Sequence, residues 1–118
     1  MSAARRAAPE TLKWKRILVA ALTKAEKFEE AEILGRELFK ETEQVLGASH
    51  QSTLVSLRDL GAIYRSQGRL EEAISALERA FKGLTRILSS EHPLTKDFLS
   101  RYSEVLEEVE EKEVLECM

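Results

Sequence analysis

The sequence predicts an all-α fold: a right-handed α-solenoid of antiparallel helix pairs, with five helices or about two and a half repeats. The first observation is self-similarity, since segment 28–68 aligns without a gap on segment 70–110, an offset of 42 residues. The second is composition, because the 118 residues are 43% hydrophobic and 33% charged, with only two prolines and five glycines, as in a folded, helix-rich chain. The pairs that are identical across the offset are Glu29/Glu71, Glu30/Glu72, Ala31/Ala73, Phe39/Phe81, Lys40/Lys82, Leu46/Leu88, His50/His92, Thr53/Thr95 and Leu57/Leu99.

Apolar residues at helical spacing predict the first helix of each repeat. An i, i+3, i+4 pattern along 12–25 recurs along 54–64, and again in a fifth helix from about Leu94 to Glu111. Pro93 suits the first turn of that fifth helix, where a missing N–H costs nothing. The apolar positions are Leu12, Ile17, Leu18, Ala21, Leu22 and Ala25; then Leu54, Leu57, Leu60, Ala62, Ile63 and Tyr64; then Phe98, Leu99, Tyr102, Val105, Leu106 and Val109.

The second helix of each repeat is predicted over 29–46 and 71–88. Each opens on the triplet Glu-Glu-Ala, whose carboxylates are favourable at a helix N-terminus. Gly47 follows the first of these helices, and Gly68 separates the central helix pair. The sequence therefore predicts turns at both glycines.

The chain is expected to form one domain over 11–112, between a flexible N-terminal tail, 1–10, and a short C-terminal tail, 113–118. No membrane interaction is expected, because the longest apolar run, Ile17–Leu22, is too short to span a bilayer. A single cysteine, Cys117, rules out an intrachain disulfide and suits a reducing compartment. We therefore expect a cytoplasmic protein, or an organellar one if the basic segment around Arg5 and Arg6 is a targeting signal.

The residues inside the period resemble the tetratricopeptide repeat. Large, small, aromatic and turn residues follow one another in its order, and the 42-residue period resembles the longer-helix repeats of the kinesin light chain family. The resemblance covers roughly 11–111 and implies a non-enzymatic adaptor or scaffold that holds a peptide or helix of a partner protein in a concave groove. The residues that carry it are Leu57, Leu60, Gly61, Tyr64, Gly68, Ala73, Leu77 and Ala80, with the loops Val45-Leu46-Gly47-Ala48-Ser49-His50 and Glu91-His92-Pro93-Leu94-Thr95.

Charged residues on the first helix of each repeat determine the charge expected in the predicted groove. Its basic members are Lys13, Arg16, Lys24, Arg58 and Arg65, whereas the fifth helix brings Asp97, Glu104, Glu107 and Glu108 to the same face. A cationic groove would attract an acidic or phosphorylated segment of a partner. The alternative is that these are ordinary solvated charges on exposed helix faces.

The first predicted helix suggests a second function, an end-on interface. Its segment 18–22 is apolar all round, so one packing face would leave apolar surface in water. The alternative hypothesis is thus a structural or accessory subunit that docks into a larger complex or a homo-oligomer. The residues predicted to form this interface are Trp14, Ile17, Leu18 and Val19.

Other site types are not expected. His50 and His92 occupy equivalent loops of successive repeats, so helix capping or loop packing is a better explanation than shared metal ligation. No nucleophile elbow, phosphate loop or zinc-ligand spacing is present, and we predict no catalytic residues, metal or cofactor. The overall pI near 5.5 does not favour binding to nucleic acid, so no nucleic-acid partner is expected.

Overall fold

A computed structural model describes the backbone of residues 9–118 and the side chains from Leu12 onward. The basic segment 1–8, predicted as part of a tail or a targeting signal, lies outside the described residues. All regular structure in the described part is helical, which confirms the predicted fold class. The five helices are α2 (Pro9–Lys24), α3 (Phe28–Leu46), α4 (Gln51–Ser66), α5 (Leu70–Ile87) and α6 (Pro93–Cys117).

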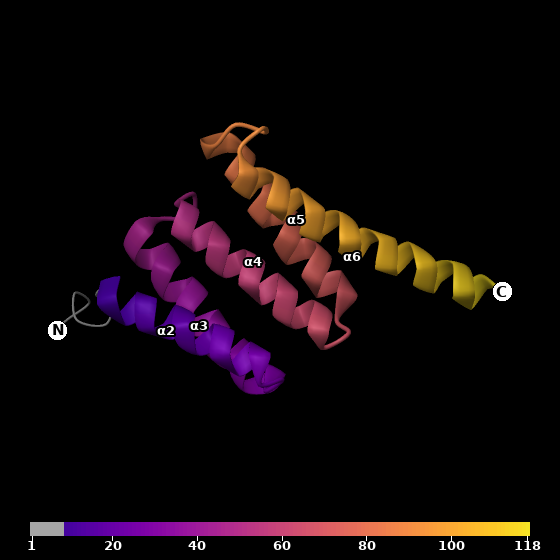
Figure 1. Cartoon of the computed structure of the whole chain (residues 1–118), viewed down its shortest axis with the longest axis horizontal. Helices are drawn as coiled ribbons and strands as arrows, with labels where there is room; N and C mark the ends of the chain where they lie inside the picture. Colours follow the sequence, from indigo (N-terminus) through magenta and orange to yellow (C-terminus); the bar gives the residue numbers. More distant parts are fainter. Residues whose placement is uncertain (1–8) are drawn as a thin grey trace.

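The helices form two layers. In Figure 1, α2, α4 and α6 lie nearer the viewer, with α3 and α5 behind them. Each helix packs mainly against its neighbours in sequence, as expected for antiparallel pairs in a solenoid. The overall dimensions are 57 × 34 × 20 Å, and the shortest fits two layers of helices.

The α4–α5 seam depends on small residues, as the repeat pattern predicted. Gly61 on α4 faces α5 so closely that an added Cβ would lie 2.8 Å from Leu77 Cγ and 3.5 Å from the carbonyl oxygen of Ala73. Ala73 is completely buried, and Leu77 is 2% exposed. Larger side chains at either small residue would therefore push the two helices apart.

The core lies between the two layers, and α4 contributes to every part of it. Nine of its residues are buried, more than in any other helix within the described range. One cluster joins α2 and α3 to Ile63 of α4, and two others join α4 to α5 and α6. The central helix pair is thus the best-packed part of the array.

The two loop histidines are helix N-caps, which confirms the capping interpretation. His50 Nδ1 accepts a hydrogen bond from the Ser52 backbone N–H at 3.0 Å, and His92 Nδ1 accepts one from the Leu94 N–H at 3.1 Å. Each histidine therefore satisfies one of the otherwise unpaired N–H groups at the start of α4 or α6. Both predicted turn glycines also have positive φ, 96° at Gly47 and 79° at Gly68.

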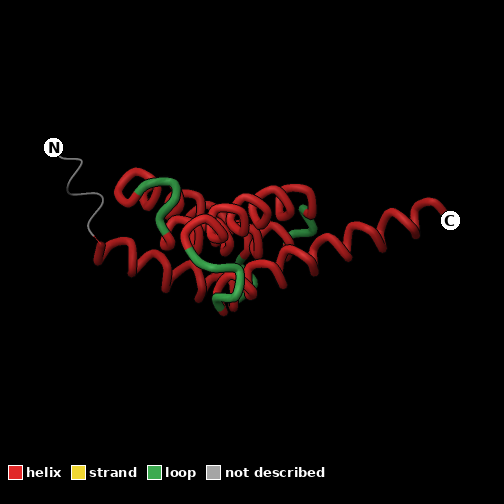
Figure 2. The backbone as a smooth tube through the Cα atoms, turned by 90° about the horizontal axis from the view of Figure 1, so that it is seen from above, coloured by secondary structure: helices red, strands yellow, loops and turns green. Residues whose placement is uncertain are grey.

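The structure differs from expectation at both ends of the array. The fifth helix was predicted to end near Glu111, but α6 continues to Cys117, so most of the expected C-terminal tail is helical. No glycine or proline stops the helix after Pro93, and the glutamates and leucines of its last turns are good helix formers. Figure 2 shows these last turns extending well beyond the other helices. At the other end α2 already begins at Pro9, inside the expected N-terminal tail.

Candidate functional site

A groove between α2 and α4 carries several of the predicted site residues; we call it the inner groove. It consists of two hollows of about 450 Å³ and 520 Å³. Lys13 and Arg16 line both hollows and therefore stand between them. The first hollow is completed by Leu12, Leu38, Thr42, Leu46, Ser52 and Ser56, and the second by Ile17, Val19, Ala20, Thr23, Arg58, Asp59 and Ala62.

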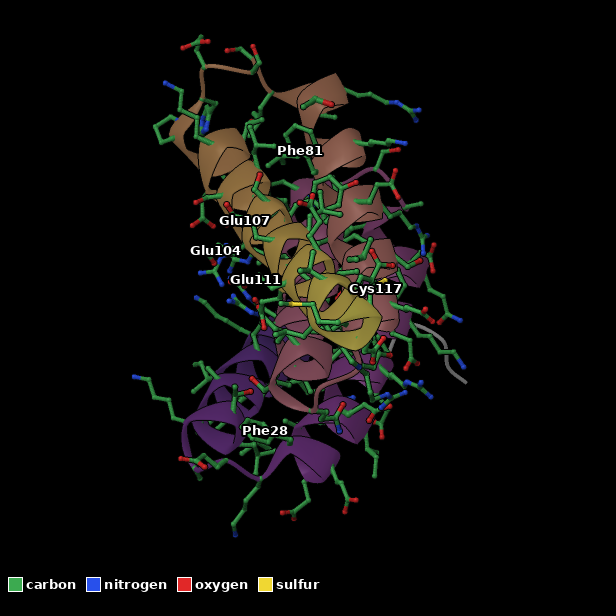
Figure 3. All side chains as sticks on the ribbon, turned by 90° about the vertical axis from the view of Figure 1, so that its right-hand side faces the viewer. Phe28, Phe81, Glu104, Glu107, Glu111 and Cys117 are labelled. Carbon is green, nitrogen blue, oxygen red and sulfur yellow. The ribbon has the colours of Figure 1, made fainter. Side chains whose placement is uncertain are left out.

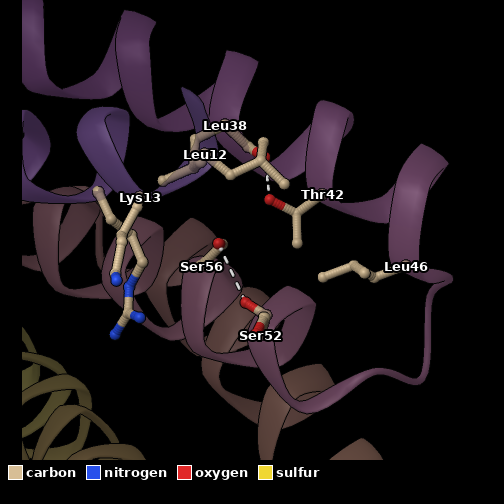
Figure 4. Close-up of a pocket in the computed structure, with 8 residues that line it drawn as sticks. Leu12, Lys13, Leu38, Thr42, Leu46, Ser52 and Ser56 are labelled. Atoms are coloured by element: carbon tan, nitrogen blue, oxygen red, sulfur yellow. Dashed lines mark hydrogen bonds between the residues drawn. The ribbon is translucent and has the colours of Figure 1, made fainter. Parts of the chain in front are cut away.

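The floor of the inner groove is apolar. Leu12, Val19 and Leu38 are 8%, 3% and 1% exposed, and they belong to the cluster that joins α2 to α3. Two of the three hydroxyl groups that line the first hollow donate to backbone carbonyls, Thr42 Oγ1 to Leu38 at 2.6 Å and Ser56 Oγ to Ser52 at 3.1 Å (Figure 4). With those protons already donated, the hollow suits an apolar side chain more than a strongly polar one.

Lys13 and Arg16 give the groove its positive charge. Both are exposed, and neither makes an ion pair with a described side chain. Their neighbour Lys15 is different, because it points to α3 and pairs with Glu37 and Glu41. Of the three cations in the first half of α2, one therefore pairs with carboxylates of α3 and two face the groove.

Between α4 and α6 the same inner face is closed by ion pairs. Arg58 lies 3.1 Å from a carboxylate oxygen of Asp97 and 5.2 Å from the centre of the Phe98 ring. Arg65 pairs with Glu104 at 3.1 Å and also with Glu108. Figure 3 shows Glu104 on the same side of α6 as Glu107 and Glu111.

The pKa of Arg65 reflects this pairing. Partial burial works to lower it, but the hydrogen bonds and negative charges of Glu108 and Glu104 outweigh burial and raise the pKa above its usual value. Arg58 and Arg65 were predicted as cations open to a ligand, and in the structure the chain's own carboxylates neutralise them. The predicted cationic face therefore shrinks to its α2 side.

Lys24, the remaining predicted groove cation, lies in the last turn of α2 outside both hollows. It is exposed, and its charge is favourable at the C-terminal end of a helix. Lys24 is therefore not part of the inner groove.

Three of the four residues predicted for the end-on interface are exposed to solvent. Trp14, Ile17 and Leu18 are 72%, 62% and 48% exposed. Val19 is the exception and corrects the prediction, because it is 3% exposed and packs in the core with Ala31 and Leu38. A helix that is apolar on several sides gives no sequence signal for which side packs inward. Ile17 also lines the inner groove, so the two candidate surfaces meet there.

Sequence reasoning missed most of the groove lining. Ala20 and Thr23 follow Arg16 and Ile17 at helical spacing, so they share a face that could have been read from the sequence. The contributions of α3 and α4, Leu38, Thr42 and Ser56 among them, depend on the spacing between helices and had no local signal.

A second cluster of charges joins three helices near the turn between α4 and α5. Arg69 pairs with Glu32 and Glu72, each at 2.6 Å, and its guanidinium lies 4.7 Å from the centre of the Tyr64 ring. Hydrogen bonding to Glu72 is the main cause that raises the pKa of Arg69, and the same contact lowers the pKa of Glu72. Because the charges of Arg69, Glu32 and Glu72 are paired with one another, the cluster stabilises the packing of the three helices and provides no binding or catalytic site.

Neither a metal site nor a membrane span emerges from the described residues. Within 9–118, no three His, Cys, Asp or Glu side chains are arranged to hold a metal ion. Over the same residues, every helix is too short or too polar to cross a bilayer.

Comparisons with known proteins agree with this architecture. Two solved structures resemble the chain, that of a Podosopora anserina protein described as a kinesin light chain with nearly identical TPR-like repeats and that of a variant of it. Each aligns with a TM-score of 0.78 and 24% sequence identity over 83% of this chain and 46% of its own. The chain thus spans less than half the length of these structures, and the likeness shows the fold.

No match was found among curated proteins. The tetratricopeptide repeat profile matches residues 10–86, well over half of the sequence. This chain belongs to the tetratricopeptide repeat family.

Proposed function

We propose that the chain is a non-enzymatic adaptor that binds an acidic segment of a partner protein in the inner groove. The fold is that of a protein-interaction module in general. The observation that carries the proposal is the contrast along the inner face: the α2–α4 side is hollow and keeps Lys13 and Arg16 facing the groove, whereas the α4–α6 side is closed by ion pairs. No cofactor and no nucleic acid take part. The module is proposed to act in the cytoplasm, where the exposed thiol of Cys117 would stay reduced.

The arrangement of the groove defines its ligand. The two cations stand between two hollows with apolar floors, so a carboxylate or phosphate flanked by apolar side chains would satisfy all three features. The span from Leu12 to Thr23 is about 17 Å at about 1.5 Å per residue of helix. That length accommodates roughly five residues of an extended peptide, at about 3.3 Å each, or about three turns of a helix.

Charge reversal tests the proposal. A peptide selected from a display library with a fixed central glutamate would be titrated into the wild-type chain, into Lys13→Glu with Arg16→Glu, and into a control, Lys24→Glu with Lys27→Glu. Both double variants change the net charge equally on or next to α2, but only the first alters the groove. We expect the groove variant to lose at least tenfold in affinity and the control to lose less than threefold, since distant exposed charges are screened. Equal losses would show that binding follows net charge rather than the groove.

A second candidate function, end-on docking, is favoured by the exposure of Trp14, Ile17 and Leu18. Apolar docking of this kind would persist at high salt, whereas binding through Lys13 and Arg16 would weaken. Trp14→Ser should then remove any salt-resistant association of the chain with a partner or with itself. Salt-resistant association that survives Trp14→Ser would exclude this surface.

A further inference from the structure

We propose that the projecting end of α6 is itself a ligand for the inner groove, in a second copy of the chain, so that copies associate head to tail. This inference rests on the proposed function, because it uses the same groove. It adds the identity of one occupant and a mode of assembly.

The donor surface lies on the last turns of α6. Val114, Leu115 and Met118 are 59%, 70% and 91% exposed. Val114 and Leu115 follow Glu111 at the spacing i+3 and i+4 and share one face of α6 with it, and Met118 is the C-cap residue directly after the helix. Glu113 and Glu116 are on the other side of the helix, where they face the start of α5. The tip of α6 therefore carries an unpartnered stripe that is acidic toward its beginning and apolar toward its end.

The inner groove has the complementary order. Its cations, Lys13 and Arg16, precede the apolar surface of Ile17 and Ala20 along α2. The stripe from Glu107 to Met118 measures about 17 Å at about 1.5 Å per residue, which matches the estimated length of the groove. Glu107 and Glu111, which Figure 3 shows on the same side of α6, would then lie against the cations, with the apolar side chains over the apolar surface.

The opposite charges of the two ends of the molecule also support head-to-tail association. Segment 104–118 carries seven glutamates against Lys112, whereas α2 is rich in lysine and arginine. Opposite charges on the two ends attract successive copies and disfavour pairing of like ends.

The contact has to form between chains. In Figure 1 the tip of α6 and helix α2 lie at opposite ends of the molecule, which is 57 Å long. A contact between two different surfaces is heterologous, and it leaves one groove and one α6 tip open at the ends of every dimer. Association would therefore continue into longer rows or closed rings as the concentration rises.

Two variants that each lack one surface test this inference with the full chain. Lys13→Glu with Arg16→Glu removes the groove charges, and Leu115→Glu with Met118→Glu removes the apolar tip. Sedimentation velocity under reducing conditions, which exclude Cys117 disulfides, would measure the mass of each protein from about 10 to 500 μM, a range that suits weak contacts. We expect the wild type to grow in mass with concentration and to dissociate at high salt. Each variant alone should remain a monomer, and an equal mixture should double in mass and stop at the dimer.

A wild type that stays monomeric over the whole range would overturn the inference, as would a mixture that does not form dimers. Circular dichroism of both variants checks that the substitutions, all at exposed positions, leave the fold intact. Binding of the library-selected peptide distinguishes a failure of the self-association proposal from a failure of the proposed function. If the peptide binds the groove while the wild type stays monomeric, only self-association is wrong; if neither occurs, both proposals fail.

Discussion

Replacing Gly61 with alanine tests the closest approach in the fold. The added Cβ would lie 2.8 Å from Leu77 Cγ and 3.0 Å from Leu77 Cδ2, well inside van der Waals contact. Leu77 is 2% exposed and sits in a packed cluster, so it has little room to move. Alanine in a helix interior gains about 1 kcal/mol over glycine, whereas overpacking costs about 1–3 kcal/mol. We expect a net loss of about 1 kcal/mol, or about 4 °C in Tm for a domain of this size.

Gly35 provides the matched control for this substitution. A Cβ there would meet Leu60 Cδ2 at 3.2 Å, so this methyl group needs to shift by only a few tenths of an ångström. Gly35→Ala should therefore be neutral or stabilising by up to about 1 kcal/mol. Urea unfolding followed by circular dichroism measures both variants.

Leu77→Ala adds an independent check on the same contact. It should cost about 2–5 kcal/mol alone and less in the Gly61→Ala background, because it removes the clash. A Gly61→Ala protein at least as stable as Gly35→Ala would refute the close approach of α4 and α5.

Two further predictions concern polar groups. Thr53 and Thr95 are equivalent across the repeat, yet Thr53 Oγ1 donates to the Gly47 carbonyl at 2.7 Å, whereas the buried Thr95 hydroxyl has no partner among the described atoms. Thr95→Val should be neutral or stabilising and Thr53→Val should cost about 1 kcal/mol in the same unfolding assay; the opposite order would contradict the hydrogen-bond assignment. Arg65→Met should leave helical content unchanged but speed amide hydrogen exchange across the middle of α6, because it removes the pairs with Glu104 and Glu108. Unchanged exchange there would mean that these pairs do not hold α6 against α4.

The array itself was predictable because its signals are local or periodic. The offset of 42 residues placed the helices and brought His50 and His92 to equivalent caps. Gly61 and Ala73 indicated where the two central helices pack, because only small side chains fit where helices approach this closely.

The site was only partly predictable because it depends on the spacing between helices. Whether Arg58 and Arg65 face a ligand or the carboxylates of α6 is decided by how closely α4 and α6 approach, and no sequence period reports that distance. Similarly, the apolar surface of α2 did not reveal that Val19 packs inward while Trp14 is exposed. α6 is longer than expected because no residue after Pro93 signals a helix end. A missing stop signal predicts the end of a helix less well than a glycine or proline does.

Mapping of a bound peptide by NMR tests the central claim most directly. The ¹⁵N-labelled chain would be titrated with the library-selected acidic peptide, and amide shifts would be followed along all five helices. We expect the largest changes along 12–23 of α2 and 52–62 of α4, which line the two hollows, with small changes at 104–108, where α6 stays paired with Arg65. Changes concentrated on α5 and α6, or the failure of every acidic peptide to shift the α2 and α4 amides, would contradict it.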